Sequence, residues 1–348
     1  MKKKDVLDLI RYHFENDSTA FKNQSLEIAR EFSNSGEEQL SSYIMGLISQ
    51  ADTFIPQESN LNEFFQIVPI DAKSLPLPTP ILDDVKGIIN AVNHNVGIHK
   101  FLFVGSPGTG KTESVKQVAR LLNRELLMVN FSSLMDSKLG QSAKNLISLF
   151  DVINQIPNPN NFVILFDEID ALVLDRINSN DIREMGRLTS EFLKLLDRLS
   201  TNIILIGTTN LYENIDKALS RRFDAIVPFD RYTSEDLVEI AEVFLNQYLK
   251  QFKTAKRDIK LFKKILTTVK KLPYPADLKN IIRTSLAFSN ENDQYDYLKR
   301  LVKSFHNGRI PSIKQLNKLG FTVREIEIIT GVSKSSVSRE LSEESKHE

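Results

Sequence analysis

Residues 101–122 read FLFVGSPGTGKTESVKQVARLL, which places a short apolar run, a glycine-rich turn and an amphipathic segment in direct succession. The turn fits the pattern G-x-x-x-x-G-K-[ST] over residues 105–112, and a strand before it and a helix after it are the context that this pattern requires. The glycines allow successive backbone N–H groups to converge on phosphate oxygens, and the N-terminus of the next helix adds favourable partial charge. A chance glycine turn is the alternative, but strand, loop, Lys-Thr pair and helix together favour a phosphate-binding loop.

Two carboxylates follow a second apolar run. Phe162–Phe166 leads directly into Asp167 and Glu168. The carboxyl ends of parallel strands border the crevice in which ligands bind, so both side chains are predicted to face the phosphates. We expect Asp167 to hold Mg²⁺ together with the Thr112 hydroxyl, and Glu168 to polarise the water that attacks the γ-phosphate. Taken alone, the two acids would suggest a solvated turn, and the phosphate-binding loop upstream favours a catalytic role instead.

The predicted ligands are therefore ATP and Mg²⁺. Lys111 is expected to reach the β- and γ-phosphates, and the metal is expected on Thr112 and Asp167. The residues predicted to contact the nucleotide are those of the loop, the residue after it and the first acid: Gly105, Ser106, Pro107, Gly108, Thr109, Gly110, Lys111, Thr112, Glu113 and Asp167.

Short apolar runs alternate with helical patterns from Lys100 onward. Strands that alternate with helices form parallel sheets covered on both faces, so the predicted fold class is α/β, a P-loop NTPase with a five-stranded parallel sheet. After Thr233 the periodicity is helical and predicts a C-terminal helical lid. The five candidate strands are Phe101–Val104, Leu126–Val129, Phe162–Phe166, Ile203–Ile206 and Ala225–Val227, and the candidate lid helices are Ser234–Phe252, Asp258–Lys271 and Pro275–Phe288.

Breaks between these patterns predict four regions. The stretch Pro69–Pro80 is predicted to be a linker, because proline disfavours helix and cannot donate to a strand ladder. The polar stretch Ser289–Asp296 is expected to lead into a last helical segment beyond Pro311. The predicted domains are a helical N-terminal segment over 1–55, the α/β nucleotide-binding domain over 70–230, the lid over 231–290 and a helix–turn–helix tail over 311–345.

The composition excludes several kinds of protein. The chain has 348 residues, no cysteine, and 45 acidic against 45 basic side chains. Without cysteine there is no disulfide, thiolate zinc site or cysteine nucleophile, and we expect a cytoplasmic protein. The apolar runs are strand-length, so no membrane span is predicted. Residues 297–348 carry ten basic against six acidic side chains, which leaves a local nucleic-acid site open at this end.

In combination, these motifs resemble those of AAA+ ATPases over about residues 70–290. Ile203–Asn210 resembles the sensor-1 strand of that family, which implies that its last residue helps to position the attacking water. Leu219–Asp224 resembles the arginine-finger segment, which implies that Arg221 and Arg222 reach into a neighbouring subunit's site in a ring, expected to be a hexamer. We expect these arginines on the far side of the sheet order from their own phosphate loop.

The same resemblance extends to the predicted lid. Tyr274–Asn280 resembles the sensor-2 helix of the AAA subgroup. Members of that subgroup usually lack a sensor arginine at this place, so the resemblance implies no catalytic role for Lys279 or Arg283.

Two further segments resemble parts of AAA+ proteins that act on other macromolecules. Ser137–Gly140 resembles the central-pore loop, so Lys138, Leu139 and Gly140 are the predicted pore residues. Protein-remodelling members usually have an aromatic residue where this chain has Lys138, which leaves an ordinary solvated loop as the alternative. The N-terminal segment is similar to that of small bacterial AAA ATPases, some of which are encoded beside subtilisin-like proteases. An adaptor role toward a protein client or partner protease and a simple packing role both stay open.

Residues 321–341 resemble a helix–turn–helix. Thr322 and Glu325 are placed to form a capping box, and Gly331 to make the turn. Glu327 stands where related motifs usually have a small alanine, so looser packing is expected there. A helical hairpin used only for protein contacts is the alternative to DNA binding. The predicted DNA-binding surface lies on the second helix: Lys334, Ser335, Ser338 and Arg339.

Together, the motifs and the resemblance predict an Mg²⁺-dependent ATPase that converts ATP to ADP and phosphate. The expected function is remodelling or unfolding of a macromolecule, with a protein as the expected client, by an oligomeric ring. The alternative is a nucleotide-controlled DNA-binding regulator that acts through the C-terminal helix–turn–helix.

Overall fold

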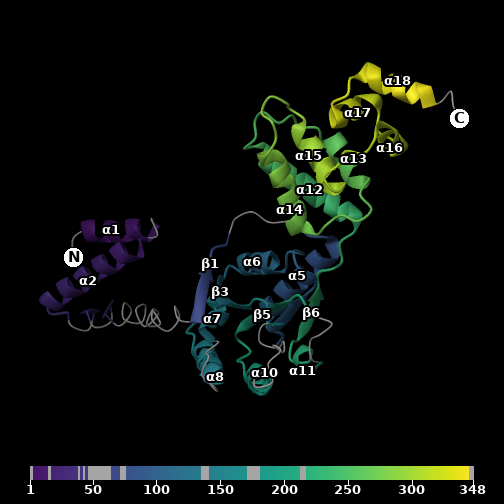
Figure 1. Cartoon of the computed structure of the whole chain (residues 1–348). Helices are drawn as coiled ribbons and strands as arrows, with labels where there is room; N and C mark the ends of the chain where they lie inside the picture. The colour runs from purple at the N-terminus through teal and green to yellow at the C-terminus, as the bar shows by residue number, and fades with distance from the viewer. Residues whose placement is uncertain are drawn as a thin grey trace.

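The computed structural model describes residues 3–14, 17–37, 40–41, 44–45, 64–70, 76–134, 141–170, 181–211 and 217–344. Within them, an α/β part built around one sheet is followed along the chain by an all-helical part (Figure 1). The α/β part contains β1 (Phe65–Val68), α5 (Thr79–Asn93), β2 (Lys100–Val104), α6 (Lys111–Leu121), β3 (Glu125–Val129), α7 (Phe131–Leu134), α8 (Gln141–Asn154), η1 (Pro159–Asn161), β4 (Phe162–Phe166), α10 (Asp181–Asp197), β5 (Ile204–Thr209), α11 (Lys217–Ser220) and β6 (Ala225–Pro228).

The sheet has six strands in the order β1-β3-β4-β5-β2-β6. Five are parallel and correspond to the five predicted runs. β1 pairs antiparallel with β3, with Phe65 opposite Val129, so the prediction of a five-stranded parallel sheet is corrected to six strands with an antiparallel edge. The sequence pattern missed β1 because it is four residues long and exposes Ile67, and so lacks the continuous apolar run of a strand buried on both faces.

Alternate residues of the central strands divide between two apolar cores, one on each face of the sheet. In β2, Phe101 and Phe103 lie in the core that also contains residues of α5 and α6. Leu102 and Val104 lie in the other core, with residues of α7, α8 and α10. Both faces of the sheet are therefore covered, as the apolar strands predicted, and the strand ends that carry polar residues are held by packing on two sides.

The helical part consists of α12 (Ser234–Leu249), α13 (Ile259–Thr267), α14 (Pro275–Ala287), α15 (Asp296–Phe305), α16 (Ile313–Lys318), α17 (Val323–Thr330) and α18 (Lys334–Glu344). One apolar core runs through all of these helices, from Leu237 in α12 to Val337 in α18. α15 was not among the predicted helices, although its buried residues Tyr297, Leu298 and Leu301 have helical spacing. Through α15 the predicted lid and the predicted tail are packed against each other without a break.

The N-terminal helices α1 (Lys3–Phe14) and α2 (Ser18–Asn34) contact each other. Asp17 caps α2 by accepting the backbone N–H of Ala20 at 2.9 Å, and Gly36 follows the helix with a φ of 84°. Among the helices that the structure describes, none is both long and apolar enough to cross a lipid bilayer.

Candidate nucleotide-binding site

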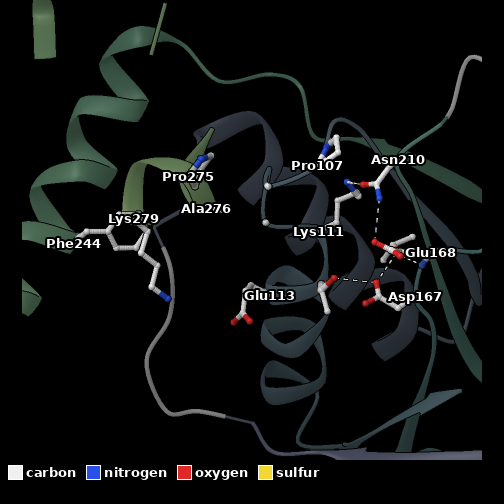
Figure 2. A pocket seen from close by; sticks show the side chains of 14 residues that line it. Pro107, Lys111, Glu113, Asp167, Glu168, Asn210, Phe244, Pro275, Ala276 and Lys279 are labelled. Atoms are coloured by element: carbon white, nitrogen blue, oxygen red, sulfur yellow. Dashed lines mark hydrogen bonds between the residues drawn. The ribbon is translucent and has the colours of Figure 1, made fainter. Parts of the chain in front are cut away.

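The strand order brings three separate stretches of the chain to one edge of the sheet. β5 lies between β4 and β2, with Phe166 of β4 opposite Gly207 and Val104 of β2 opposite Thr209. The residues that directly follow these strands are the acid pair, Asn210 and the glycine-rich loop, and all three groups contribute to one cavity (Figure 2). The strand order, which the sequence does not reveal, places Asn210 between the other two groups.

Lys111 lies at the centre of the loop and is almost fully buried. Its ammonium group donates to the carbonyls of Gly105 at 2.7 Å and Ser106 at 3.0 Å, and to Asn210 Oδ1 at 2.7 Å. Burial lowers the pKa of Lys111 from its ordinary value, and nearby carboxylates, with Asp230 the strongest, oppose this shift. The loop therefore holds a cation among its own carbonyl oxygens, where a phosphate would provide compensating negative charge.

Thr112 and Asp167 provide neighbouring oxygen ligands. Thr112 Oγ1 donates to Asp167 Oδ1 at 2.9 Å, and Thr208 Oγ1 donates to the same carboxylate oxygen at 2.6 Å. Mg²⁺ in nucleotide sites takes one or two protein oxygens, while phosphates and waters complete its shell. Over the residues that the structure describes, no group of three or more His, Cys, Asp or Glu side chains is arranged to hold a metal. This donor set fits Mg²⁺ that arrives with a nucleotide.

Glu168 is held at the mouth of the crevice by its backbone and by its side chain. Its φ is 55°, in the left-handed region that non-glycine residues seldom adopt, and its N–H donates to Thr208 Oγ1 at 2.9 Å. Its Oε1 accepts a hydrogen bond from Asn210 Nδ2 at 3.2 Å. The structure thus connects Glu168 to Lys111 through a single amide, that of Asn210. An uncommon backbone conformation is typical of residues whose side chain must point in a required direction.

Asp230, which the sequence analysis did not select, holds the first turn of the loop. Its carboxylate accepts the Ser106 N–H at 3.0 and 3.1 Å. Burial alone would raise the pKa of Asp230, but hydrogen bonds from Ser106 and Tyr274 and the positive charge of Lys111 outweigh it, so the pKa is lowered. Gly105 has a φ of 148°, and a Cβ there would lie 3.1 Å from Asp230 Oδ2, so only glycine fits beside this carboxylate without displacement.

Two residues that follow β6 in the chain donate hydrogen bonds to carbonyl oxygens of the same loop. The Tyr232 hydroxyl donates to the Thr109 carbonyl at 2.6 Å, and the Ala276 N–H donates to the Gly108 carbonyl at 3.0 Å. Burial raises the pKa of Tyr232, so its hydroxyl stays protonated and remains a donor. The conformation of the phosphate loop is therefore coupled to the position of the lid.

A cavity of about 350 Å³ lies between the loop, the acid pair and the lid. This volume is within the usual range for small-molecule sites. Among the predicted nucleotide contacts, Gly105, Ser106 and Thr109 do not line the cavity, whereas the other seven do. The lining residues are Pro107, Gly108, Gly110, Lys111, Thr112, Glu113, Asp167, Glu168, Thr208, Asn210, Phe244, Pro275, Ala276 and Lys279.

The two predicted finger arginines do not line this cavity. They precede β6, which pairs with β2, so the expectation that they lie on the far side of the sheet order was wrong. The arginines are instead separated from the phosphate loop along the length of β2. Ala225, which follows them, pairs with Phe101 near the start of β2, whereas the loop follows the end of β2. Arg222 Nε lies 3.3 Å from Asp197 Oδ2, and Arg222 Nη1 donates to the Ala218 carbonyl at 2.7 Å, whereas Arg221 is exposed.

The predicted pore residues Lys138, Leu139 and Gly140 lie outside the described residues. In the tail, the four residues of the predicted DNA-binding surface on α18, Lys334, Ser335, Ser338 and Arg339, are all exposed. The predicted capping box of Thr322 and Glu325 is present. Glu327 accepts the Lys334 N–H at 2.9 Å and so caps α18 at the tight turn.

Asp230, Tyr232 and Thr208 were not predicted as parts of the site. Thr208 was predictable, since it lies within the segment that resembles a sensor-1 strand, two residues before Asn210. Asp230 and Tyr232 offered no local signal, because their partners are more than 120 residues away in the chain.

The fold and the site together define a P-loop NTPase. The family model for the ATPase family associated with various cellular activities (AAA) matches residues 101–231, which contain the loop, the acid pair, Asn210 and the two arginines. The chain therefore contains an AAA ATPase domain, and the predicted AAA+ resemblance is confirmed.

Comparisons with known proteins agree with this assignment. An uncharacterized AAA family ATPase, y4kL of Sinorhizobium fredii, is 36% identical over 132 residues, which cover 38% of this chain and 39% of the relative. A putative 26S proteasome regulatory subunit homolog of Methanothermobacter thermautotrophicus is 31% identical over 146 residues, or 41% of this chain and 38% of the relative. The chain thus matches well under half the length of these relatives.

A solved structure shares the fold over a larger part of the chain. A chain in the HORMA:CdnC:Trip13 complex of Escherichia coli MS115-1 is similar with a TM-score of 0.56 and 15% identity, over 72% of this chain and 97% of that chain. At this identity the similarity concerns the fold.

Proposed function

We propose that this chain is an Mg²⁺-dependent ATPase that works in an oligomeric ring and remodels a macromolecule, with a protein as the client. The observation that carries the proposal is the side-chain network at the strand ends. Lys111, Asn210 and Glu168 form one hydrogen-bonded chain, beside the Thr112–Asp167 pair. These are the groups needed to bind phosphates, hold a metal and activate water.

Each residue has a distinct role in this mechanism. Lys111 and the loop N–H groups bind the β- and γ-phosphates, and the helix dipole of α6 favours their charge. Thr112 and Asp167 would hold Mg²⁺, which would supply charge neutralisation on the phosphates. Glu168 accepts a proton from the attacking water, and Asn210 fixes the direction of the Glu168 carboxylate.

The placement of the arginines supports the proposed ring. Arg221 and Arg222 lie near the start of β2, whereas their own phosphate loop lies at its end. In a ring they stabilise charge on the phosphoryl group bound by the neighbouring subunit, a contribution of about 10³–10⁵ in rate when such a finger operates.

The experiment that tests this function is affinity capture with Glu168→Gln, which is designed to hold ATP without turnover. We expect this variant to form larger particles with ATP, seen by light scattering, and to retain a protein client only while ATP is present. Lys111→Ala is the matched control and should retain neither ATP nor client. A Glu168→Gln protein that stays monomeric with ATP and enriches nothing over the control would contradict the proposal.

A DNA-binding regulator is the second candidate, and one observation favours it. The exposed cations Lys334 and Arg339 lie on α18, in a tail with three short helices and a tight turn at Gly331. A helix that presents cations and serines in this way suits phosphates and base edges in a major groove. Binding of labelled duplex DNA, described in the Discussion, separates this candidate from a tail that contacts protein only.

A further inference from the structure

A second cavity lies in the helical part, at the connection between α15 and α16, and is called the tail cavity below. Its volume is about 640 Å³, within the usual range for small-molecule sites, and it shares no lining residue with the nucleotide cavity. The four residues of the predicted DNA-binding surface on α18 do not line it either. Its lining includes three basic side chains, those of His306, Arg309 and Lys318, and three apolar ones, those of Ile310, Pro311 and Leu319.

The backbone around the tail cavity is fixed by a turn and a helix cap. After α15, Asn307 and Gly308 have φ values of 51° and 80°, which reverse the chain. Ser312 then caps α16 through a capping box with Gln315. Leu316 of α16 is buried in the apolar core that also contains the lid helices. A ligand therefore meets walls that are already ordered, which favours binding.

The cations of the tail cavity have no acidic counterpart in its lining. Residues 297–324 contain seven basic and no acidic side chains. Two of the seven, on α15, pair with aspartates that precede this stretch. Arg309 and Lys318 are exposed, and neither forms an ion pair within the part of the chain that the structure describes. The cavity therefore presents positive charge that favours an anionic ligand.

The apolar part of the lining decides between two kinds of anionic ligand. Leu319 is 43% exposed, and Ile310 and Pro311 are half-buried. The backbone of a DNA duplex would offer phosphates to the cations, but nothing that covers this apolar surface. A peptide that carries carboxylates next to an apolar side chain matches both parts, because its apolar side chain removes the wall from water.

We propose that the tail cavity binds a short peptide segment of a partner protein, in which acidic side chains stand next to an apolar one. Arg309 and Lys318 hold the carboxylates, and Leu319 contacts the apolar side chain. This binding does not require ATP hydrolysis, so the inference goes beyond the proposed function and does not depend on it. Because α16 shares one core with the lid helices, a partner bound here is attached to the lid.

The tail offers matched variants. Arg309→Ala with Lys318→Ala removes one arginine and one lysine from the cavity. Lys334→Ala with Arg339→Ala removes the same two residue types from α18 and is the control. Arg309→Lys with Lys318→Arg keeps both charges in the cavity. Leu319→Ser changes the apolar wall alone.

The test is fluorescence anisotropy of the full chain with three labelled pools of short synthetic peptides, across a salt series. The first pool combines aspartate and glutamate with leucine and phenylalanine. The second has serine in place of the apolar residues, and the third has lysine in place of the acids. The wild type should bind the first pool, the second at least about tenfold more weakly, and the third not at all.

The variants should separate the contributions of charge and apolar contact. Arg309→Ala with Lys318→Ala should weaken binding of the first pool at least about tenfold at low salt and by less at high salt, because charge-assisted hydrogen bonds are lost. Leu319→Ser should weaken it at every salt concentration. The α18 control and the variant that keeps both charges should stay within about twofold of wild type.

Several results would overturn the inference. One is no binding of the first pool at low salt, and another is equal affinity for the first two pools, which would indicate charge attraction alone. Equal losses in the two alanine double variants would show that the cavity is not the site. If no pool binds and the cavity variant instead loses affinity for labelled duplex DNA, the cations serve nucleic acid. A chain that binds the first pool but does not hydrolyse ATP would contradict the proposed function and support this inference.

Discussion

Asn210 and Glu168, which follow two neighbouring strands, are joined by a hydrogen bond of 3.2 Å from Nδ2 to Oε1. The other end of the Asn210 amide, Oδ1, accepts a hydrogen bond from the Lys111 ammonium group at 2.7 Å. One side chain therefore connects the carboxylate proposed to activate water with the ammonium proposed to bind phosphate. Because an amide offers a donor at one end and an acceptor at the other, these partners fix its orientation.

Asn210→Ala should consequently impair chemistry more than binding. Without the amide, Glu168 loses the donor that directs it, and we expect kcat to fall about 10²-fold with a much smaller change in nucleotide affinity. Steady-state phosphate release and ADP titration measure the two effects separately. Asn154→Ala is the control, since Asn154 accepts the Ser200 N–H outside the site. Unchanged kcat in Asn210→Ala would refute the positioning role.

Complementation between subunits tests the arginines. A mixture of Arg222→Ala and Lys111→Ala proteins should hydrolyse ATP faster than either variant alone, because an intact arginine can then face an intact phosphate loop. Specific activity of the wild type should also rise with protein concentration as rings assemble. Mixtures without rescue, together with activity independent of concentration, would count against action in a neighbouring site.

DNA binding by the tail is expected to be weak, sensitive to salt and strengthened by assembly. One module makes few phosphate contacts, whereas several tails in a ring bind the same duplex with avidity. Fluorescence anisotropy with labelled duplex across a salt series, with and without a slowly hydrolysed ATP analogue, measures this. Lys334→Ala with Arg339→Ala should abolish binding and leave ATP hydrolysis intact.

The control for that experiment removes the same charge elsewhere. Lys270→Ala with Lys271→Ala changes two exposed lysines outside the tail. If duplex DNA does not bind even at low salt, or if binding survives the tail substitutions, the tail is a protein-contact hairpin.

The Lys264–Glu325 ion pair between α13 and α17 is expected to stabilise the helical part in a pH-dependent way. Its Nζ–Oε2 distance is 2.5 Å. Burial alone would raise the pKa of Glu325, but hydrogen bonds from Lys264 and Thr322 lower it below the usual value of 4.5. A carboxyl group with a lowered folded-state pKa contributes stability above its unfolded pKa, and this contribution is lost as the pH falls through the folded pKa.

Glu325→Gln isolates that contribution, because glutamine also completes a capping box. We expect the free energy of unfolding to fall by about 1 kcal/mol near neutral pH and to change little at an acid pH below the folded-state pKa, where the carboxyl group is protonated. Urea denaturation at the two pH values gives both numbers. An equal loss at both values would show that packing, and not charge, is responsible.

Local sequence patterns predicted the elements that hold the candidate catalytic residues. The features that these patterns did not predict depend on contacts between residues far apart in the chain. The loop at Gly105–Thr112 and the acids after Phe166 were predictable, because each motif is continuous in sequence and follows a buried strand. The edge strand β1 was not, since its pairing with β3 and not its own apolarity defines it. Asp230 was invisible for a related reason, because its partner Ser106 is 124 residues away.

The helical part likewise contains features that were predictable from local patterns and features that were not. Its first three helices followed from periodicity, whereas the inclusion of α16, α17 and α18 in its core depends on packing that α15 mediates. Lys279 was assigned no role by resemblance, and only the three-dimensional arrangement shows that it lines the cavity.

The most direct test of the account is a paired measurement on Glu168→Gln, of ATP retained on the protein and of phosphate released. Loss of the carboxylate removes the base but keeps the shape and the acceptor for Asn210, so we predict that ATP is retained while phosphate release falls at least about 10²-fold. Lys111→Ala, assayed in parallel, should retain no ATP. Near-normal phosphate release by Glu168→Gln would contradict the assignment of Glu168 as the group that activates water.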